Sequence, residues 1–194
     1  MQPPHNFTPE TDQEVKIVNC PIFAEASEFG SPRRGHPEGK VGNHIEQILA
    51  YIDTKDWETY RTNLRTLAFT HDLGKYRVVR TNGGHIQGKP HSQHSLDIAL
   101  EYDLSNDPKI LDIIPIHDKY YGFFKKDTLG KFKPQRFIET FQGIDLELLT
   151  RFNYADSCQR DKDSVVWFEY ICHALGLKNH LLFKEEPELV DRGS

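Results

Sequence analysis

From Val41 onward, apolar residues recur along this chain at three- and four-residue spacing, and no stretch shows the period of two typical of a strand. The first stripe consists of Ile45, Ile48, Leu49 and Ile52, which would share one face of a helix. Similar stripes predict further helices over about 55–71, from Ser92, after Asp107, over 144–158 and over 164–175. The sequence therefore predicts an all-α helical bundle.

The segments between and around these stripes differ in composition. Residues 1–35 are rich in Pro, Gly, Ser and Glu and are expected to form an irregular N-terminal arm. Residues 75–90 and the aromatic, basic segment 119–133 read as loops, the second a mobile one. Residues 36–184 are expected to form one domain, and the acidic residues 185–194 a flexible tail. Gly74 follows a predicted helix end, where a left-handed residue is common.

Composition excludes several classes of protein. The 194 residues suit one domain, and 37% hydrophobic and 27% charged residues are typical of a globular protein. A net charge of −5 disfavours a duplex-binding protein. Cys20, Cys158 and Cys172 form no CxxC pair and are expected to be reduced thiols. No apolar stretch approaches the roughly 18 residues of a membrane span, so we expect no membrane association and a cytoplasmic location.

A histidine and an aspartate stand side by side at the end of one predicted helix. His71 and Asp72 could offer an imidazole nitrogen and a carboxylate oxygen to one divalent cation. Alone, the pair could equally be a buried histidine with its neighbour and an aspartate near a helix end. Other residues of ligand type lie next to further apolar runs: His44, His91, His94, His117, Asp118 and Asp156. This spaced series favours a metal centre.

The order His44, His71-Asp72, Asp156 resembles the H…HD…D signature of the HD-domain metal-dependent phosphohydrolases. Residues 36–44 resemble the segment that begins with the HPEG motif and leads to the first metal ligand in the HD domain of bacterial tRNA CCA-adding nucleotidyltransferases. Residues 68–75 resemble the LLHDIGK block of those enzymes, and 151–160 their ADxxGR block, with Gln159 where they usually have Gly. No nucleotidyltransferase motif occurs upstream, so the resemblance is to the HD module alone and extends over about 35–163.

The resemblance implies a set of site residues. His44, His71, Asp72 and Asp156 are the expected metal ligands, and His91 and His117 would be extra ligands for a second ion. His94 could take the place of His91, but Pro90 and Ser95 around His91 fit the family pattern better. Asp72 and Lys75 are the expected catalytic residues, and Asp72 could serve as a base as well as a metal ligand. Expected substrate-binding residues are Lys75, His94 and Arg160.

The resemblance also implies a function. We expect a phosphohydrolase that uses metal-activated water on a nucleotide, a 2′,3′-cyclic phosphate, an RNA terminus or another phosphate ester. One or two divalent ions are expected, chosen from Mn, Fe, Co, Ni, Mg and Zn. Imidazole with carboxylate suits Mn, Fe, Co, Ni or Zn. Two alternatives stay open: a two-metal hydrolase of dinucleotides or cyclic nucleotides, and a sensor that binds a nucleotide or metal without turnover. Small HD proteins commonly dimerise, although nothing in the sequence demonstrates a homodimer.

Overall fold

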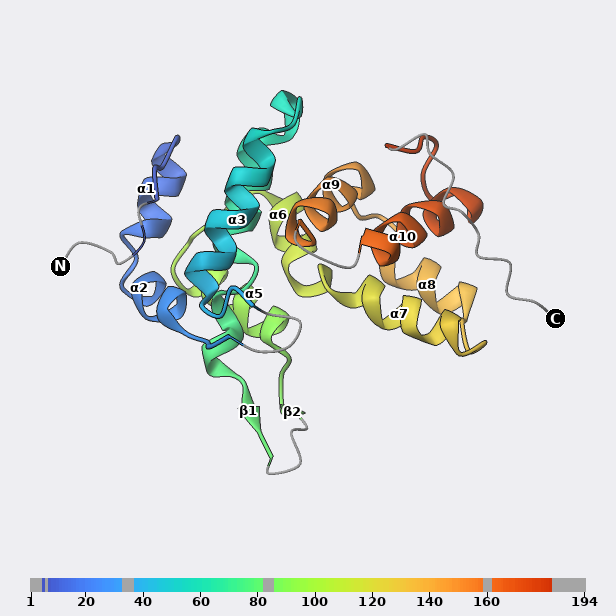
Figure 1. Ribbon diagram of the computed structural model, residues 1–194, viewed down its shortest axis with the longest axis horizontal. Coiled ribbons are helices and arrows are strands. Elements are labelled where there is room, and N and C mark those ends of the chain that lie inside the picture. The colour runs from blue at the N-terminus through green and yellow to red at the C-terminus, as the bar shows by residue number, and fades with distance from the viewer. Residues whose placement is uncertain (1–4, 6, 33–36, 82–85, 159–161, 183–194) are drawn as a thin grey trace. The chain divides into compact units, whose positions relative to one another are not determined.

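The structure, a computed structural model, describes residues 5, 7–32, 37–81, 86–158 and 162–182. It consists of helices and one small hairpin, which confirms the predicted all-α class (Figure 1). The chain divides into two compact units, residues 1–117 and residues 118–194. Among the described residues, no helix combines the length and hydropathy that a membrane span requires.

The first unit contains the predicted helices around the His71-Asp72 pair. Helix α4 packs against α1 and α3, and α5 packs against the short helix η2 that follows α4. Strands β1 and β2 form an antiparallel pair within the segment predicted as a loop. The elements are α1 (Asp12–Val18), α2 (Pro21–Glu28), α3 (Val41–Asp53), η1 (Glu58–Tyr60), α4 (Arg61–Thr70), η2 (Leu73–Arg77), β1 (Val79–Arg80), β2 (Ile86–Gln87), α5 (His91–Glu101), α6 (Pro108–Ile113) and η3 (Ile114–Ile116).

The second unit has a core of aromatic rings contributed by three of its helices. Phe137 is fully buried, and its ring centroid lies 4.7 Å from that of Phe141 and 5.2 Å from that of Phe123. Phe168 completes this group at 5.0 Å from Phe141. The helices of this unit are α7 (Lys119–Thr128), α8 (Pro134–Phe141), α9 (Leu146–Asp156) and α10 (Lys162–Ala174).

The prediction of an irregular arm over residues 1–35 is wrong, because two helices lie within this segment. Helix α1 is capped by Thr11, whose hydroxyl accepts a hydrogen bond from the Glu14 amide at 3.1 Å. Helix α2 begins with Pro21 at its first position, where proline is well tolerated. Ile17 and Phe23 are buried. These two short helices have ordinary N-terminal signals, but they were not predicted because Pro and Gly are frequent elsewhere in the segment.

The prediction of a mobile loop over 119–133 is also wrong, since most of this segment forms helix α7. Tyr120 and Phe123, three residues apart, supply a buried face. Gly122 lies in open space on the exposed side, where it lowers helix propensity without breaking the helix. The sequence reading also missed α8, a short helix that begins with Pro134. All three cysteines are free.

A buried ion pair joins α1 to α4. Arg65 donates to both carboxylate oxygens of Glu14 at 2.9 Å, and both side chains are buried. Removing only the cation leaves an uncompensated buried carboxylate. We therefore expect Arg65→Met to lower the free energy of unfolding by about 3–5 kcal/mol, measured by urea denaturation.

The double variant Glu14→Leu/Arg65→Met is the control, because it removes both charges together. It should be clearly more stable than Arg65→Met alone. An equal loss in both variants would mean that packing by the arginine stem, not the ion pair, holds α1 on α4.

Candidate metal centre

The His71-Asp72 pair is held rigidly at the end of helix α4. The His71 amide donates to the Leu67 carbonyl at 2.9 Å and so completes the last turn of the helix. Leu67, Ala68 and Phe69 are fully buried and anchor that turn in the core of the first unit. The side chains of His71 and Asp72 are also buried. Because the turn that precedes them is buried, His71 and Asp72 also lie in the interior of the first unit.

Backbone carbonyls fix the orientation of two imidazoles. The Nδ1 atom of His71 lies 3.0 Å from the Leu67 carbonyl oxygen, and Nδ1 of His117 lies 2.7 Å from that of Ile114. A carbonyl oxygen only accepts hydrogen bonds, so each Nδ1 must carry the proton. In the neutral ring this leaves a lone pair on Nε2, the state in which histidine binds a metal.

Both Nε2 atoms face the carboxylate of Asp72. The distances are 3.2 Å from His71 Nε2 to Oδ2 and 3.9 Å from His117 Nε2 to Oδ1. His91 presents its own Nε2 to Oδ1 at 3.3 Å. The ammonium of Lys75 lies 2.5 Å from Oδ2. Asp72 is therefore surrounded by nitrogen atoms from three separate parts of the first unit.

His44 extends this arrangement from helix α3. Its ring centroid is 5.7 Å from that of His71, which in turn is 5.1 Å from His117, and His117 is 5.4 Å from His91. One potential ligand atom each from His71, Asp72 and His117 lies within 4.8 Å of the others. We call His44, His71, Asp72, His91 and His117 the histidine cluster; all five belong to the first unit.

The electrostatics of the cluster suit a cation. Burial alone would raise the pKa of the Asp72 carboxyl, but the charges of His71 and His91 in their protonated forms and of Lys75 more than reverse this and hold that pKa well below its usual range. The carboxylate is therefore ionised at neutral pH. Its Oδ1 atom is buried and accepts no hydrogen bond from the described residues. A buried anionic oxygen ringed by imidazole nitrogens is a donor set that fits a divalent transition metal.

Of the two alternative histidines on α5, His91 faces the cluster. His94 has its Nδ1 4.0 Å from Asp97 on the same helix and is not among the residues grouped around Asp72. His91 is the first residue of α5, so its position depends on where this helix begins and how closely it approaches Asp72.

Gly74 allows the start of α5 to lie close to Asp72. The sequence predicted a different role for this glycine, that of a left-handed residue at a helix end. It does not have the left-handed backbone expected of a helix cap. Instead, a Cβ atom there would lie 2.3 Å from the His91 carbonyl oxygen and 2.4 Å from the Ser95 amide nitrogen. The Gly74 amide donates to the Ser95 hydroxyl at 2.8 Å. Glycine is needed because the start of α5 lies directly against η2.

Two predicted site residues do not belong to the first unit. Asp156 is the last residue of α9, which lies in the second unit. Its role as a fourth ligand therefore stays a prediction. Arg160 lies outside the described residues.

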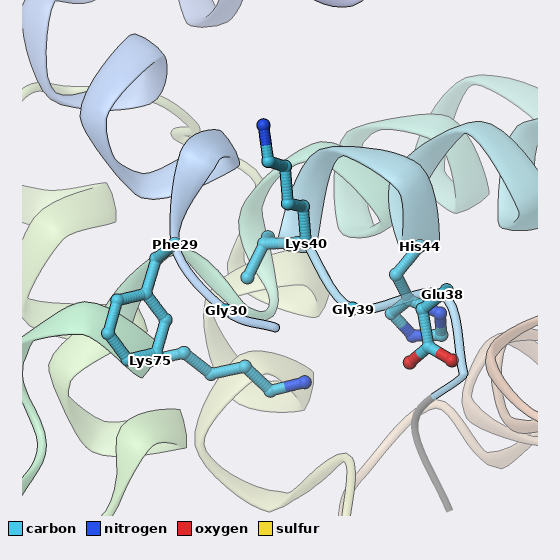
Figure 2. A pocket seen from close by; sticks show the side chains of 8 residues that line it. Phe29, Gly30, Glu38, Gly39, Lys40, His44 and Lys75 are labelled. Atoms are coloured by element: carbon cyan, nitrogen blue, oxygen red, sulfur yellow. The ribbon is translucent and has the colours of Figure 1, made fainter. Parts of the chain in front are cut away.

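A small pocket opens beside the cluster in the first unit. It is lined by His44 and Lys75, together with residues that the sequence reading did not assign to the site: Phe29, Gly30, Glu38, Gly39, Lys40 and Val41. In Figure 2 the Lys75 ammonium points towards the side of the pocket where His44 and Glu38 lie. Phe29 and Gly30 follow α2, in the segment expected to be irregular, so no pattern in the sequence could have placed them here.

Comparisons with known proteins add no assignment. No protein-family model matches the chain, and neither the curated proteins nor the solved structures include a match.

The close contact at Gly74 generates a prediction. Gly74→Ala should push α5 away from η2, destabilise the fold by about 1–3 kcal/mol and weaken metal binding by displacing His91. Metal affinity is measured by isothermal titration with Mn²⁺ or Co²⁺, alongside urea denaturation.

Gly122→Ala is the matched control, because a Cβ atom at Gly122 meets nothing within 4 Å. It should leave metal affinity unchanged and raise stability slightly. If Gly74→Ala binds metal as tightly as the unmodified protein, the approach of α5 does not position a ligand.

Proposed function

We propose that this protein is a divalent-metal-dependent phosphohydrolase acting on a nucleotide, a 2′,3′-cyclic phosphate or another phosphate ester. The observation that carries the proposal is the orientation of the imidazoles around Asp72. His71 and His117 donate from Nδ1 to backbone carbonyls and turn Nε2 towards one buried carboxylate. Neutral rings in this orientation direct lone pairs at an anion, which is favourable only with a cation between them.

A bound divalent cation would lower the pKa of a water molecule and neutralise charge on a phosphoryl group. His44, His71, Asp72, His91 and His117 are the residues of the first unit that would hold it. Asp156, by resemblance to the HD signature, is proposed as a further ligand. The resemblance motivates the choice of phosphate esters, and the chemistry of the donor set agrees with it.

Lys75 supplies the charge that a phosphate requires. Its ammonium pairs with Asp72 at 2.5 Å and also lines the pocket next to His44. An anionic substrate in this pocket would therefore meet a fixed cation beside the metal ligands. We propose that Lys75 binds a phosphate oxygen and stabilises the negative charge that develops during attack by water. Asp72 orients this lysine and holds the metal.

The number of donors supports a second candidate, a hydrolase with two metal ions. The first unit alone contributes four imidazoles and one carboxylate, more than one tetrahedral ion uses. His91 and His117 each have a nitrogen within 4.8 Å of the other and could belong to a second ion. Metal stoichiometry distinguishes the two candidates.

The metal prediction concerns His71. We expect His71→Ala to lose bound metal and to abolish Mn²⁺- or Co²⁺-dependent hydrolysis of 2′,3′-cyclic AMP, 5′-AMP or para-nitrophenyl phosphate. His173→Ala, a change at an exposed histidine on α10, is the control and should keep both properties. Elemental analysis of the purified protein gives one or two equivalents of metal. Bound metal without turnover on any phosphate ester would favour a sensor, and no bound metal would refute the metal centre itself.

The substrate prediction concerns Lys75. Lys75→Gln should retain metal, because it removes a cation that competes for the Asp72 carboxylate, yet kcat/KM should fall by about a hundredfold. Lys89→Gln, which removes an exposed cation outside the pocket, should leave kcat/KM unchanged. A loss of metal in Lys75→Gln would instead assign this lysine a structural role.

A further inference from the structure

Basic side chains are concentrated in the α7–α8 segment of the second unit, where two helices are joined by a short turn (Figure 1). Residues 119–136 contain six basic residues and one acidic residue, a net charge of +5 in a chain whose net charge is −5. The rest of the chain therefore carries −10. All six cations are exposed, and we call them the basic hairpin: Lys119, Lys125, Lys126, Lys131, Lys133 and Arg136.

Several surface cations elsewhere in the chain pair with carboxylates. Lys16 pairs with Asp103 at 2.5 Å, Lys89 pairs with Asp97 at 2.7 Å, and Arg77 pairs with Glu101 at 3.2 Å. Within the described part of the chain, no cation of the basic hairpin has a carboxylate within 4.0 Å. The segment's own acid, Asp127, accepts a hydrogen bond from the Trp167 indole at 2.9 Å. This positive charge is therefore not neutralised by the described residues.

An aromatic ring lies among these cations. Tyr121 is 37% exposed on α7, and the Lys125 ammonium lies 4.3 Å from its ring centroid. The Phe124 ring stacks beside Tyr121 with centroids 6.4 Å apart and holds that ring in place. Gly122, next to Tyr121, leaves open space above the helix. The face combines a partly exposed ring with several cations and little steric obstruction.

We propose that the basic hairpin binds single-stranded nucleic acid, with the cations on the phosphates and Tyr121 against a base. Single strands expose their base faces, which stack on aromatic side chains irrespective of sequence. A long duplex is disfavoured, because it would extend over a chain surface that carries −10 elsewhere. A membrane is disfavoured as well, since within residues 119–136 Leu129 is the one exposed aliphatic side chain of large size. None of its residues belongs to the histidine cluster, and the proposed binding does not require a bound metal.

The test is fluorescence anisotropy with a labelled 15-nucleotide oligouridine and the full-length protein, over a range of KCl concentrations and with EDTA present to exclude turnover. The variant Lys125→Gln/Lys126→Gln/Lys131→Gln should weaken binding at least tenfold at low salt. It should also reduce the slope of log K against log salt by about 2, the expected effect of losing three phosphate contacts. Lys16→Gln/Lys89→Gln/Lys109→Gln, with the same change in net charge at exposed lysines of the first unit, should bind normally.

A second pair of variants tests the aromatic contact. Tyr121→Ala should weaken binding about fivefold or more, with the salt slope unchanged. Tyr170→Ala, at a tyrosine of similar exposure on α10, should have no effect. The proposal is overturned if oligouridine does not bind, if both triple variants bind equally weakly, or if the hairpin variants alter binding to phosphatidylserine vesicles and not to the oligonucleotide.

Discussion

Four elements of the first unit contact the buried carboxylate of Asp72, and the arrangement of this unit depends on these contacts. His71 approaches it from the end of α4, Lys75 from η2, His91 from the start of α5 and His117 from the end of η3. An ionised carboxylate is costly to bury unless opposite charge or hydrogen-bond donors surround it. Because the nitrogen atoms come from separate elements, these elements must converge on one point, and a bound cation would add free energy to that convergence.

The ends of the helical segments determine which nitrogen of the His71 and His117 rings carries the proton. The carbonyls of Leu67, Ala68 and Ile114 lie in the last turns of α4 and η3, where carbonyl groups often lack partners within the helix. Each of these carbonyls accepts a hydrogen bond from a histidine Nδ1, that of Leu67 in addition to the bond from the His71 amide, and so fixes the tautomer. The same contact pairs a backbone carbonyl and orients Nε2 as a potential metal ligand.

Much of the helical framework was predictable from the sequence, because a buried helix face repeats over several turns. The stripe of α3 is an example, and His44 lies within it among the buried residues Ile45 and Ile48. Helices α1, α2 and α7 were missed, since each is short and lies among Pro, Gly or Lys residues that are typical of loops. They are held by contacts with residues distant in sequence, as in the α1–α4 ion pair, and local periodicity carries little information about such contacts.

The choice between His91 and His94 shows where sequence reasoning ends within the site itself. Residues three apart lie on nearly the same face of a helix, so periodicity assigns both histidines to the same direction. Which one reaches Asp72 depends on where α5 begins and how closely it approaches η2. The absence of a side chain at Gly74 sets that approach, because a Cβ atom there would collide with the backbone at His91 and Ser95. The position of His91, a potential metal ligand, therefore depends on a steric contact between two elements, and this contact is visible only once the chain is folded.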